Sequence, residues 1–396
     1  MIRLLNKAYF FTIFIPLLLS EMVYAEINLS AYIPTHSLDI IRQIEPSEDG
    51  HLIVITQKGE LWKTQETGPI LLLKNVSPNI APKADYGRIA LADHQGNFLL
   101  WTKDKVYSST ISMAENASMV GLRFATIGVI KDNHNYKLAR IEIQQDKVVI
   151  TAISTQSVLP DAHPLHINLT GTDTANRHIA VLAEPDQNRY KHAVLGDNWE
   201  ATSLLYLDRH SLTPLAPALV LEDNLVFEAN QLTPLFQQGN HQIVTTISGK
   251  GKGAKIVIIG IENNMLMLLA ESLALPPNRW QSPFSFKEIL YAIQMPHLAG
   301  KLVTYKQKGS FLQESALGKG FSHHQYGHYE TDLTAKTEKF IVIPHYGYTQ
   351  VSIIDEKGQL HSLNTTLPAP IQKTRSDNKR VYLLLENGQV WVIEEK

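Results

Sequence analysis

The sequence predicts an all-β fold, a β-propeller of seven or eight blades that is closed by pairing of its N- and C-terminal strands. The first observation behind this prediction is a block that recurs around Pro234, Pro283 and Asp332, which lie 49 residues apart. Each copy holds an apolar strand, a loop with glycine, a second strand and a turn. A period of about 50 residues made of short strands is typical of propeller blades rather than of helical arrays. The second observation is that almost every other segment after the N-terminal leader also has the pattern strand, turn, strand.

The N-terminal segment 1–25 has the pattern of a secretory signal peptide. It has a basic start, an apolar run over 8–19 and the ending Val23-Tyr24-Ala25. The apolar run is too short to cross about 30 Å of hydrocarbon, so we expect a cleaved leader rather than a membrane anchor. The remaining chain, 26–396, is then expected to form one propeller domain.

Composition indicates the compartment and excludes several partners. The chain contains no cysteine. Because exported eukaryotic proteins usually carry disulfides, export without cysteine indicates a bacterial protein that is periplasmic or secreted. The formal net charge of −2 offers no field that would attract nucleic acid or anionic lipid. We therefore expect no nucleic-acid binding and no stable membrane insertion, and we expect a monomer.

The turns divide the mature chain into successive blades. In the first blade, a turn that contains Gly59 joins the apolar strand at 51–56 to the strand at 60–63, which is the pattern of a hairpin. The segment 27–34 is expected to supply the outer strand that the C-terminal unit lacks, because this pairing would remove exposed sheet edges. One misread unit would give seven blades instead of eight. The expected units are 41–75, 78–112, 118–155, 163–221, 228–271, 278–314, 323–363 and a partial unit at 371–396.

Two further features concern the packing and the loops of the blades. Trp62, Trp101 and Trp391 occupy equivalent places in their units, which indicates that they pack between neighbouring blades. The unit at 163–221 is oversized because it contains the polar insertion 185–202. We expect this insertion to protrude as a loop and to contribute to binding.

The second half of the chain, from about residue 212 to 332, resembles the FG-GAP or VCBS-type propeller repeats of integrin-like bacterial proteins. The similarity lies in FEANQLTPLFQQGNHQIVTTISG and in NRWQSPFSFKEILYAIQMPH. In that family, a calcium loop rich in Asp and Gly precedes the first strand of a blade. The corresponding stretches here, 236–241 and 285–288, provide no more than one acidic side chain each, whereas calcium takes six to eight oxygens. The resemblance therefore implies a propeller with degenerate calcium loops.

The densest group of histidines lies in SHHQYGHYETD. The spacing of His324 and His328 would place two metal ligands together on a helix, but this segment is expected to be a loop that enters a strand. We therefore expect no metal and no cofactor, and a binding role through imidazole and Tyr326 donors instead. The candidate binding residues are His323, His324, Tyr326, His328, Arg279, Trp280 and Trp199.

No catalytic motif stands out, because the chain has no cysteine nucleophile, no G-x-S-x-G elbow and no H-E-x-x-H helix. The expected function is therefore that of an exported, periplasmic, non-enzymatic propeller that binds or scaffolds a partner protein or an envelope component such as a polysaccharide. The alternative is an exported enzyme, a lyase or hydrolase acting on a saccharide, with its site at the mouth of the propeller channel. The histidines of this cluster, with Tyr326 and Arg279, would then supply acid, base and charge stabilisation.

Overall fold

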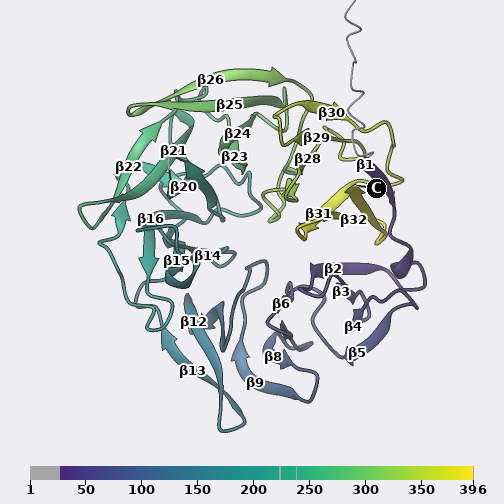
Figure 1. The fold of residues 1–396 in the computed structure, drawn as a ribbon. Coiled ribbons are helices and arrows are strands. Elements are labelled where there is room, and N and C mark those ends of the chain that lie inside the picture. The colour runs from purple at the N-terminus through teal and green to yellow at the C-terminus, as the bar shows by residue number, and fades with distance from the viewer. Residues whose placement is uncertain (1–26, 223, 238, 396) are drawn as a thin grey trace, which may run out of the picture.

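The strands form a ring of blades around a central axis (Figure 1). The computed structural model describes residues 27–222, 224–237 and 239–395. Within these residues the blades number eight, and each is made of four antiparallel strands. The predicted β-propeller is therefore confirmed, with the larger of the two expected blade numbers. The predicted signal peptide, 1–25, lies outside the described residues.

The first four blades follow one another along the chain, and each begins with its innermost strand. Blade 1 contains β2 (Ile41–Pro46), β3 (Leu52–Thr56), β4 (Glu60–Lys63) and β5 (Ile70–Lys74). Blade 2 contains β6 (Lys83–Asp85), β7 (Arg88–Ala92), β8 (Asn97–Trp101) and β9 (Val106–Ser112). Blade 3 contains β10 (Val120–Leu122), β11 (Ala125–Asp132), β12 (Asn135–Gln144) and β13 (Lys147–Ile153). Blade 4 contains β14 (Leu165–Ile167), β15 (His178–Asp186), β16 (Glu200–Leu207) and β17 (Leu219–Val220).

The remaining four blades complete the ring. After the short β18 (Leu225–Phe227), blade 5 contains β19 (Thr233–Gln237), β20 (Asn240–Gly249), β21 (Lys252–Glu262) and β22 (Met265–Glu271). Blade 6 contains β23 (Gln281–Phe286), β24 (Ile289–Gln294), β25 (Lys301–Lys308) and β26 (Phe311–Gly318). Blade 7 contains β27 (Ala335–Lys336), β28 (Phe340–Pro344), β29 (Val351–Asp355) and β30 (Leu360–Ser362). Blade 8 contains β31 (Ile371–Ser376), β32 (Arg380–Leu385), β33 (Val390–Glu395) and, from the other end of the chain, β1 (Ile27–Ala31). Short 3₁₀ helices lie at Ile33–Thr35 and Thr174–Asn176.

The two ends of the described chain close the ring within blade 8. Strand β1 pairs with β33 in antiparallel register, with Leu29 opposite Ile393 and Ala31 opposite Trp391. Figure 1 shows the C-terminal end of the chain beside β1. The predicted closure is therefore confirmed, and it removes the open edge that β33 would otherwise present.

The core lies between neighbouring blades rather than within one of them. The second strands β3 and β28 are buried along their whole length, because the two faces of each pack into two different apolar clusters. Trp62, Trp101 and Trp391 all lie in the third strand of their blades, where each packs half-buried against one of these apolar clusters. Their predicted equivalence is thus confirmed.

Three of the blades share a single hydrogen-bonded sheet. Strand β18 pairs with β16 of blade 4 and with β20 of blade 5. Strand β22 of blade 5 pairs in parallel with β26 of blade 6 at Glu271 and Phe311. Blades 4, 5 and 6 therefore belong to one sheet of 13 strands, whereas each of the other five blades is a sheet of its own.

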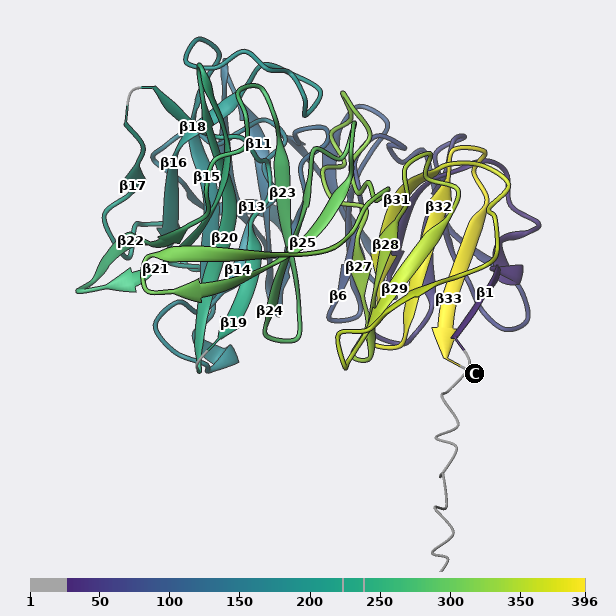
Figure 2. The same ribbon diagram turned by 90° about the horizontal axis from the view of Figure 1, so that it is seen from above.

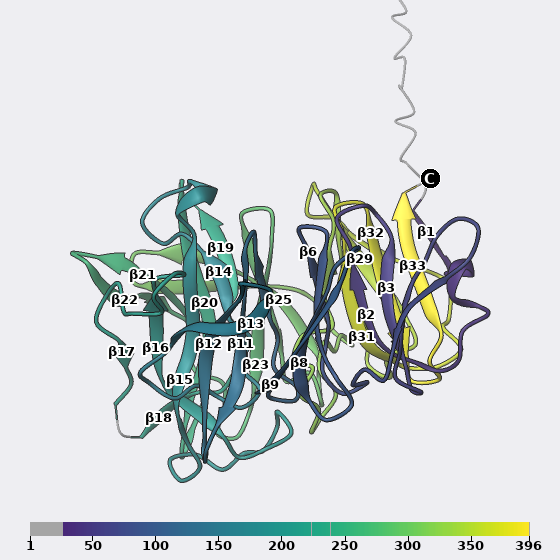
Figure 3. The same cartoon turned by 90° about the horizontal axis from the view of Figure 1, so that it is seen from below.

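The strands run between two faces of the ring, as the two edge-on views show (Figures 2 and 3). We call the face at which the innermost strands begin the top face, and the opposite one the bottom face. The connection between blades 6 and 7 contributes a stretch of chain, 322–333, that we call the crossing segment. It reaches blade 8 through Gln325, which donates to the carbonyl of Ile371 at 2.9 Å, and it reaches the lead of blade 5 through Tyr329, whose carbonyl accepts from Asn230 at 3.0 Å.

Partly buried charges hold the crossing segment in the channel. Glu330 accepts a hydrogen bond from Arg375 at 2.7 Å and lies 3.4 Å from the ammonium of Lys373. Lys373 also donates to Gln43 of blade 1 at 2.7 Å. Although burial raises the pKa of Glu330, the neighbouring charges of Arg375 and Lys373 lower it to about 2, so this carboxylate is ionised at neutral pH. The pairing therefore ties blades 8 and 1 to the connection before blade 7.

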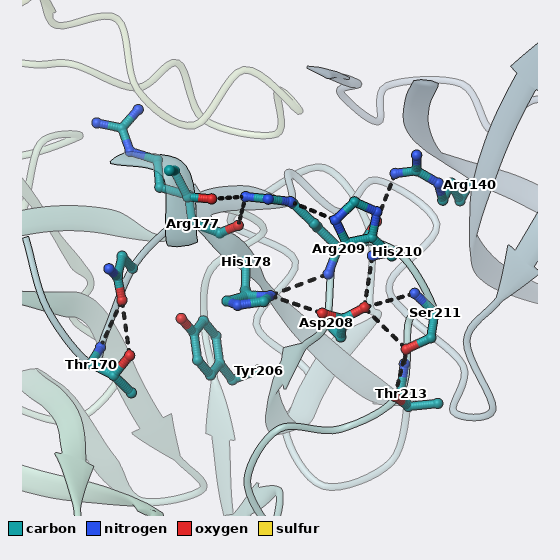
Figure 4. A network of polar contacts seen from close by, with 12 residues as sticks. Arg140, Thr170, Arg177, His178, Tyr206, Asp208, Arg209, His210, Ser211 and Thr213 are labelled. Atoms are coloured by element: carbon teal, nitrogen blue, oxygen red, sulfur yellow. Dashed lines mark hydrogen bonds and ion pairs between the residues drawn. The ribbon is translucent and has the colours of Figure 1, made fainter. Parts of the chain in front are cut away.

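A second polar network joins blades 3 and 4 on the bottom face (Figure 4). Asp208, at the turn after β16, accepts the backbone N–H of Ser211 at 2.8 Å, and its other oxygen lies 3.3 Å from Nδ1 of His178. Arg140 of blade 3 donates to the carbonyl of Arg209 at 2.9 Å. These contacts fix a turn and link two blades, and they lie on the face opposite to the pockets described below.

The insertion of blade 4 differs from its prediction. Strand β15 extends into its beginning, and the loop 187–199 folds back over the top face rather than protruding from it. Tyr190, Val194 and Leu195 are buried, and the last two pack against Trp280 of blade 6. Apolar side chains within an otherwise polar stretch are the physical reason for this packing.

Candidate functional site

The top face carries three contiguous pockets. The outer pocket, of about 680 Å³, lies over blades 6 to 8. The channel mouth, of about 690 Å³, lies over blades 1 to 3 and 8. The end pocket, of about 300 Å³, lies over blades 3 and 4. His328 lines both the outer pocket and the channel mouth, and Tyr329 lines both the channel mouth and the end pocket. Because these two residues are consecutive in the crossing segment, the three pockets form one groove along it.

The outer pocket combines exposed apolar side chains with polar ones at its rim. Leu298 is 66% exposed, and Tyr326 and Tyr346 are each 64% exposed. Single exposed apolar residues are common, but three around one pocket make a surface suited to a ligand. The residues that line the pocket include Arg279, Trp280, Met295, His297, Leu298, Tyr326, His328 and Tyr346 from the propeller, and His192 and Val194 from the insertion.

An aromatic stack forms the floor of the outer pocket. The indole of Trp280 is stacked with the imidazoles of His297 and His323, with ring centroids 6.0 Å apart in both pairs. Trp280 is buried, and its Nε1 donates to the carbonyl of Glu228 at 3.0 Å. Tyr326 meets His297 edge-on at 5.4 Å. The stack is therefore a rigid support for the pocket rather than an open aromatic face.

The imidazoles below the floor are neutral. Burial lowers the pKa of His297 to about 4 and the pKa values of His323 and His324 to about 3. Nε2 of His324 lies 2.8 Å from the carbonyl oxygen of His328, and since a carbonyl can only accept, this nitrogen carries the proton. Nδ1 of His324 then accepts from Nε2 of His297 at 3.0 Å. These rings hold the pocket in shape and carry no charge for a ligand.

One imidazole of the outer pocket does have the setting of a proton acceptor. Nδ1 of His192 lies 2.5 Å from Oε1 of Glu228, and Glu228 is fully buried. The other carboxylate oxygen of Glu228 accepts a hydrogen bond from Ser248. A carboxylate at Nδ1 fixes the proton there, so Nε2 of His192 is left as the acceptor. Sequence reasoning did not single out this pair, because its members lie in different blades; the only signal was that His192 belongs to the inserted loop.

The channel mouth is lined by amides and cations. Lys373 and Arg375 both face the single carboxylate of Glu330, and Arg42 lies at the rim, where it donates to Gln57 at 2.9 Å. The lining also includes the amide side chains of Gln43, Gln57, Asn79, Asn116 and Gln372. This pocket therefore offers many hydrogen-bond donors and acceptors and an excess of positive charge in its floor.

The structure brings four of the seven predicted binding residues together in one pocket. Arg279, Trp280, Tyr326 and His328 all line the outer pocket. The other three are His323 and His324, which are buried beneath its floor, and Trp199, which lines the end pocket.

The described ranges show how the possible metal ligands are distributed. In residues 27–222, 224–237 and 239–395, no three His, Asp or Glu side chains are grouped so that they could hold a metal ion. Of the stretches that correspond to the calcium loops of FG-GAP repeats, 285–288 forms the tight turn between β23 and β24, and the described ends of 236–241 pair as Phe236 with His241 and Gln237 with Asn240. The FG-GAP type itself stays a prediction.

Comparison with known proteins supports the fold. No protein-family model and no curated protein matches the sequence. Among solved structures, the Dos1 propeller is similar with a TM-score of 0.55 at 8% identity, over 90% of this chain and 92% of that one. Sqt1 of Saccharomyces cerevisiae gives 0.53 at 9% identity, over 90% and 96%. The computationally designed Ika8 protein gives 0.53 at 10% identity, over 90% and 96%. At such identities the likeness shows the fold alone, and that fold is the β-propeller.

Proposed function

We propose that the protein is an exported, non-enzymatic binding protein that holds an extended segment of a partner protein in the groove of its top face. The observation that carries this proposal is the continuity of three pockets of different chemistry along the crossing segment, where His328 and Tyr329 are shared between neighbours. An extended segment can place successive side chains in successive pockets, whereas a compact ligand would fill only one.

The chemistry of the groove favours a peptide over a saccharide. The exposed Leu298 and the two exposed tyrosines of the outer pocket suit an apolar side chain of a ligand. The amides of the channel mouth suit the N–H and C=O groups of an extended backbone. Sugar rings stack on open aromatic faces, but Trp280 is buried and stacked with His297 and His323, which leaves only the two tyrosines for such stacking.

The periplasm is the proposed location. The signal-peptide pattern over 1–25 and the absence of cysteine both support export in a bacterium. In the portion of the chain that the structure describes, no helix is long and apolar enough to span a bilayer. The resemblance to FG-GAP or VCBS-type repeats fits an exported propeller as well.

The proposal is tested by selecting peptides from a random display library on the mature protein and measuring their affinity by fluorescence polarisation. We expect Leu298→Glu to weaken the selected peptides by about tenfold, because it places a charge in the apolar pocket. Leu273→Glu is the matched control, since Leu273 is 75% exposed and lines none of the three pockets. Two outcomes would overturn the proposal. One is that the selected peptides bind Leu298→Glu as tightly as the wild type, and the other is that a glycan array yields a ligand whose binding this variant weakens while no such peptide is found.

A saccharide-active enzyme is the second candidate, and the pairing of His192 with Glu228 is the observation that favours it. A buried carboxylate that orients an imidazole is a common setting for a general base, and Tyr326 and Arg279 line the same pocket. The test is release of reducing ends or unsaturated products from bacterial envelope polysaccharides. Turnover that is lost in His192→Gln would favour the enzyme over the binding protein. Equal turnover rates in the wild type and in His192→Gln would exclude a catalytic role for His192.

A further inference from the structure

The end pocket has a composition unlike that of the other two pockets. Aromatic rings and carboxyl groups predominate in its lining, which consists of Tyr136, Trp199 and Tyr329 together with Glu115, Asp161 and Asp197, and in addition Asn116, Lys131 and Pro160. Trp199 is 37% exposed, so part of its ring is open to solvent. Aromatic faces and carboxylates both attract organic cations.

Asp161 supplies an unpartnered oxygen within this pocket. Its side chain is 4% exposed, and its Oδ2 accepts a hydrogen bond from Nδ2 of Asn230 at 2.9 Å. Asn230 is itself fixed, because its Oδ1 accepts from the hydroxyl of Thr331 at 2.6 Å. The other oxygen, Oδ1, accepts no hydrogen bond from any residue within the described ranges. A buried carboxylate oxygen without a donor is costly, and a ligand that donates to it would remove this cost.

Neighbouring carboxyl groups make the pocket still more favourable to positive charge. Burial and the charge of Asp197 raise the pKa of Asp161 to about 7, and burial also raises the pKa of Asp197. Burial and the charges of Glu228, Asp161 and Asp197 raise the pKa of Glu200 well above its usual range. No ion pair with a basic side chain relieves Asp161, Asp197 or Glu200 in the described part of the chain. No cation among the described residues offsets the repulsion among these groups, so a positively charged ligand would relieve it.

The aromatic walls are positioned by the same residues. The backbone N–H of Trp199 donates to Oδ1 of Asp197 at 2.8 Å, so the ring and the carboxylate are held in one turn of the insertion. Gly196, at φ +104°, lets this turn pass close to the ring of Tyr329, which an added Cβ would approach within 3.4 Å. Lys131 lies at the exposed rim, where solvent screens its charge. The pocket is thus built from three segments that meet only in the folded ring.

We propose that the end pocket binds an organic cation, the alkylammonium or guanidinium group of a ligand, with Asp161 and Asp197 as its charge partners and Trp199 and Tyr329 as its walls. A bare metal ion fits less well, because aromatic rings replace the oxygen ligands that such ions require. The source is either a lysine or arginine side chain of the bound segment or a free amine. Only the first of these sources rests on the proposed function.

The test uses n-butylammonium as the probe and uncharged butan-1-ol as its isostere, with binding to the full mature protein followed by saturation-transfer NMR. We expect n-butylammonium to bind and butan-1-ol not to. Asp161→Asn and Trp199→Leu should each weaken the probe by about tenfold, since they remove a charge-assisted contact and an aromatic wall. Asp104→Asn, which changes an exposed acid outside the groove, should have no effect. Equal binding of the two probes, or unchanged affinity in both variants, would overturn the proposal.

Two further measurements distinguish loss of the cation site from misfolding of a variant and from failure of the proposed function. Asp161→Asn removes a like charge from a crowded site, so the melting temperature of this variant should equal or exceed that of the wild type. If its melting temperature is lower, Trp199→Leu, which changes an exposed side chain, tests the cation site instead. Blocked lysine amide that binds at least as tightly as n-butylammonium assigns the site to a side chain, and binding of the free amine alone assigns it to a small amine. Leu298→Glu should leave probe binding unchanged, so loss of peptide binding with retained probe binding counts against the proposed function only.

Discussion

Nε2 of His297, which lines the outer pocket, donates a hydrogen bond to Nδ1 of His324 beneath it, and the two nitrogens lie 3.0 Å apart. This bond requires an unprotonated Nδ1 on His324, and burial, which lowers the pKa of that ring to about 3, keeps the nitrogen unprotonated at neutral pH. The floor of the outer pocket therefore depends on pH through His324, which is buried beneath it.

The first prediction follows from His323, the most deeply buried ring of this group. Burial lowers its pKa to about 3, whereas the unfolded chain has a pKa of about 6.5. Between these values the unfolded state binds a proton that the folded state does not, so this residue makes the free energy of unfolding fall with decreasing pH, by about 1.4 kcal/mol per pH unit. His323→Leu should lose this contribution to the slope in urea unfolding measured from pH 7 to pH 4. The exposed His134→Leu serves as the control, and equal slopes for the two variants would contradict the prediction.

The second prediction concerns Glu330, the single carboxylate that Arg375 and Lys373 share. Glu330→Gln leaves two partly buried cations without their charge partner and should lower the free energy of unfolding by about 2 kcal/mol. Denaturant unfolding at neutral pH measures the change. Lys339→Met, which removes one member of the exposed pair of Lys339 with Glu395, should change little. An equally small effect of Glu330→Gln would mean that the network does not hold the crossing segment.

The third prediction concerns the closure of the ring. Leu29 of β1 packs against the apolar cluster between blades 7 and 8, so Leu29→Asp should open the pairing with β33 and lower the free energy of unfolding by about 2 kcal/mol. Ile33→Asp, a few residues further on, changes a side chain that is 68% exposed and should have little effect. Thermal melting of the two variants side by side decides the matter, and coincident curves would show that closure contributes nothing.

The fourth prediction concerns metal. The melting temperature of the mature protein should be unchanged by excess EDTA, because a ligand bound only to the native state stabilises it and its removal would lower the melting temperature. A drop of several degrees that calcium restores would reveal a calcium site in the repeats. Restoration by zinc instead would point to the histidines of the crossing segment.

The blades were predictable from sequence because their signals are local. Turns with glycine, such as that at Gly59, and the recurrence around Pro234 and Pro283 set the strand order without knowledge of long-range contacts. Closure through β1 was predictable as well, because the C-terminal unit lacked one strand and one segment of the chain remained unassigned. Both predictions depend on counting strands rather than on placing side chains.

The site was predictable only in part. Arg279, Trp280, Tyr326 and His328 were found because they are polar or aromatic residues in top-face loops, and such loops converge in a ring. The same pattern also selected His323 and His324, which packing under Trp280 turns into supports of the floor. The contact of His192 with Glu228 arises from an insertion that folds onto another blade, so it cannot be predicted from the spacing of residues in the sequence.

The shared sheet of blades 4 to 6 gives the ring an uneven stiffness. Backbone pairing through β18, and between Glu271 and Phe311, links the blades of that arc, whereas the other seams are joined by side-chain contacts, such as that of Lys373 with Gln43, and by isolated bridges. We therefore expect motion between neighbouring blades mainly at the seams outside the arc. The outer pocket begins over blade 6, inside the arc, and extends over blades 7 and 8, outside it. A ligand bound in the outer pocket contacts blade 6 on one side of the seam and blades 7 and 8 on the other. Such a ligand would restrain motion across the seam between blades 6 and 7.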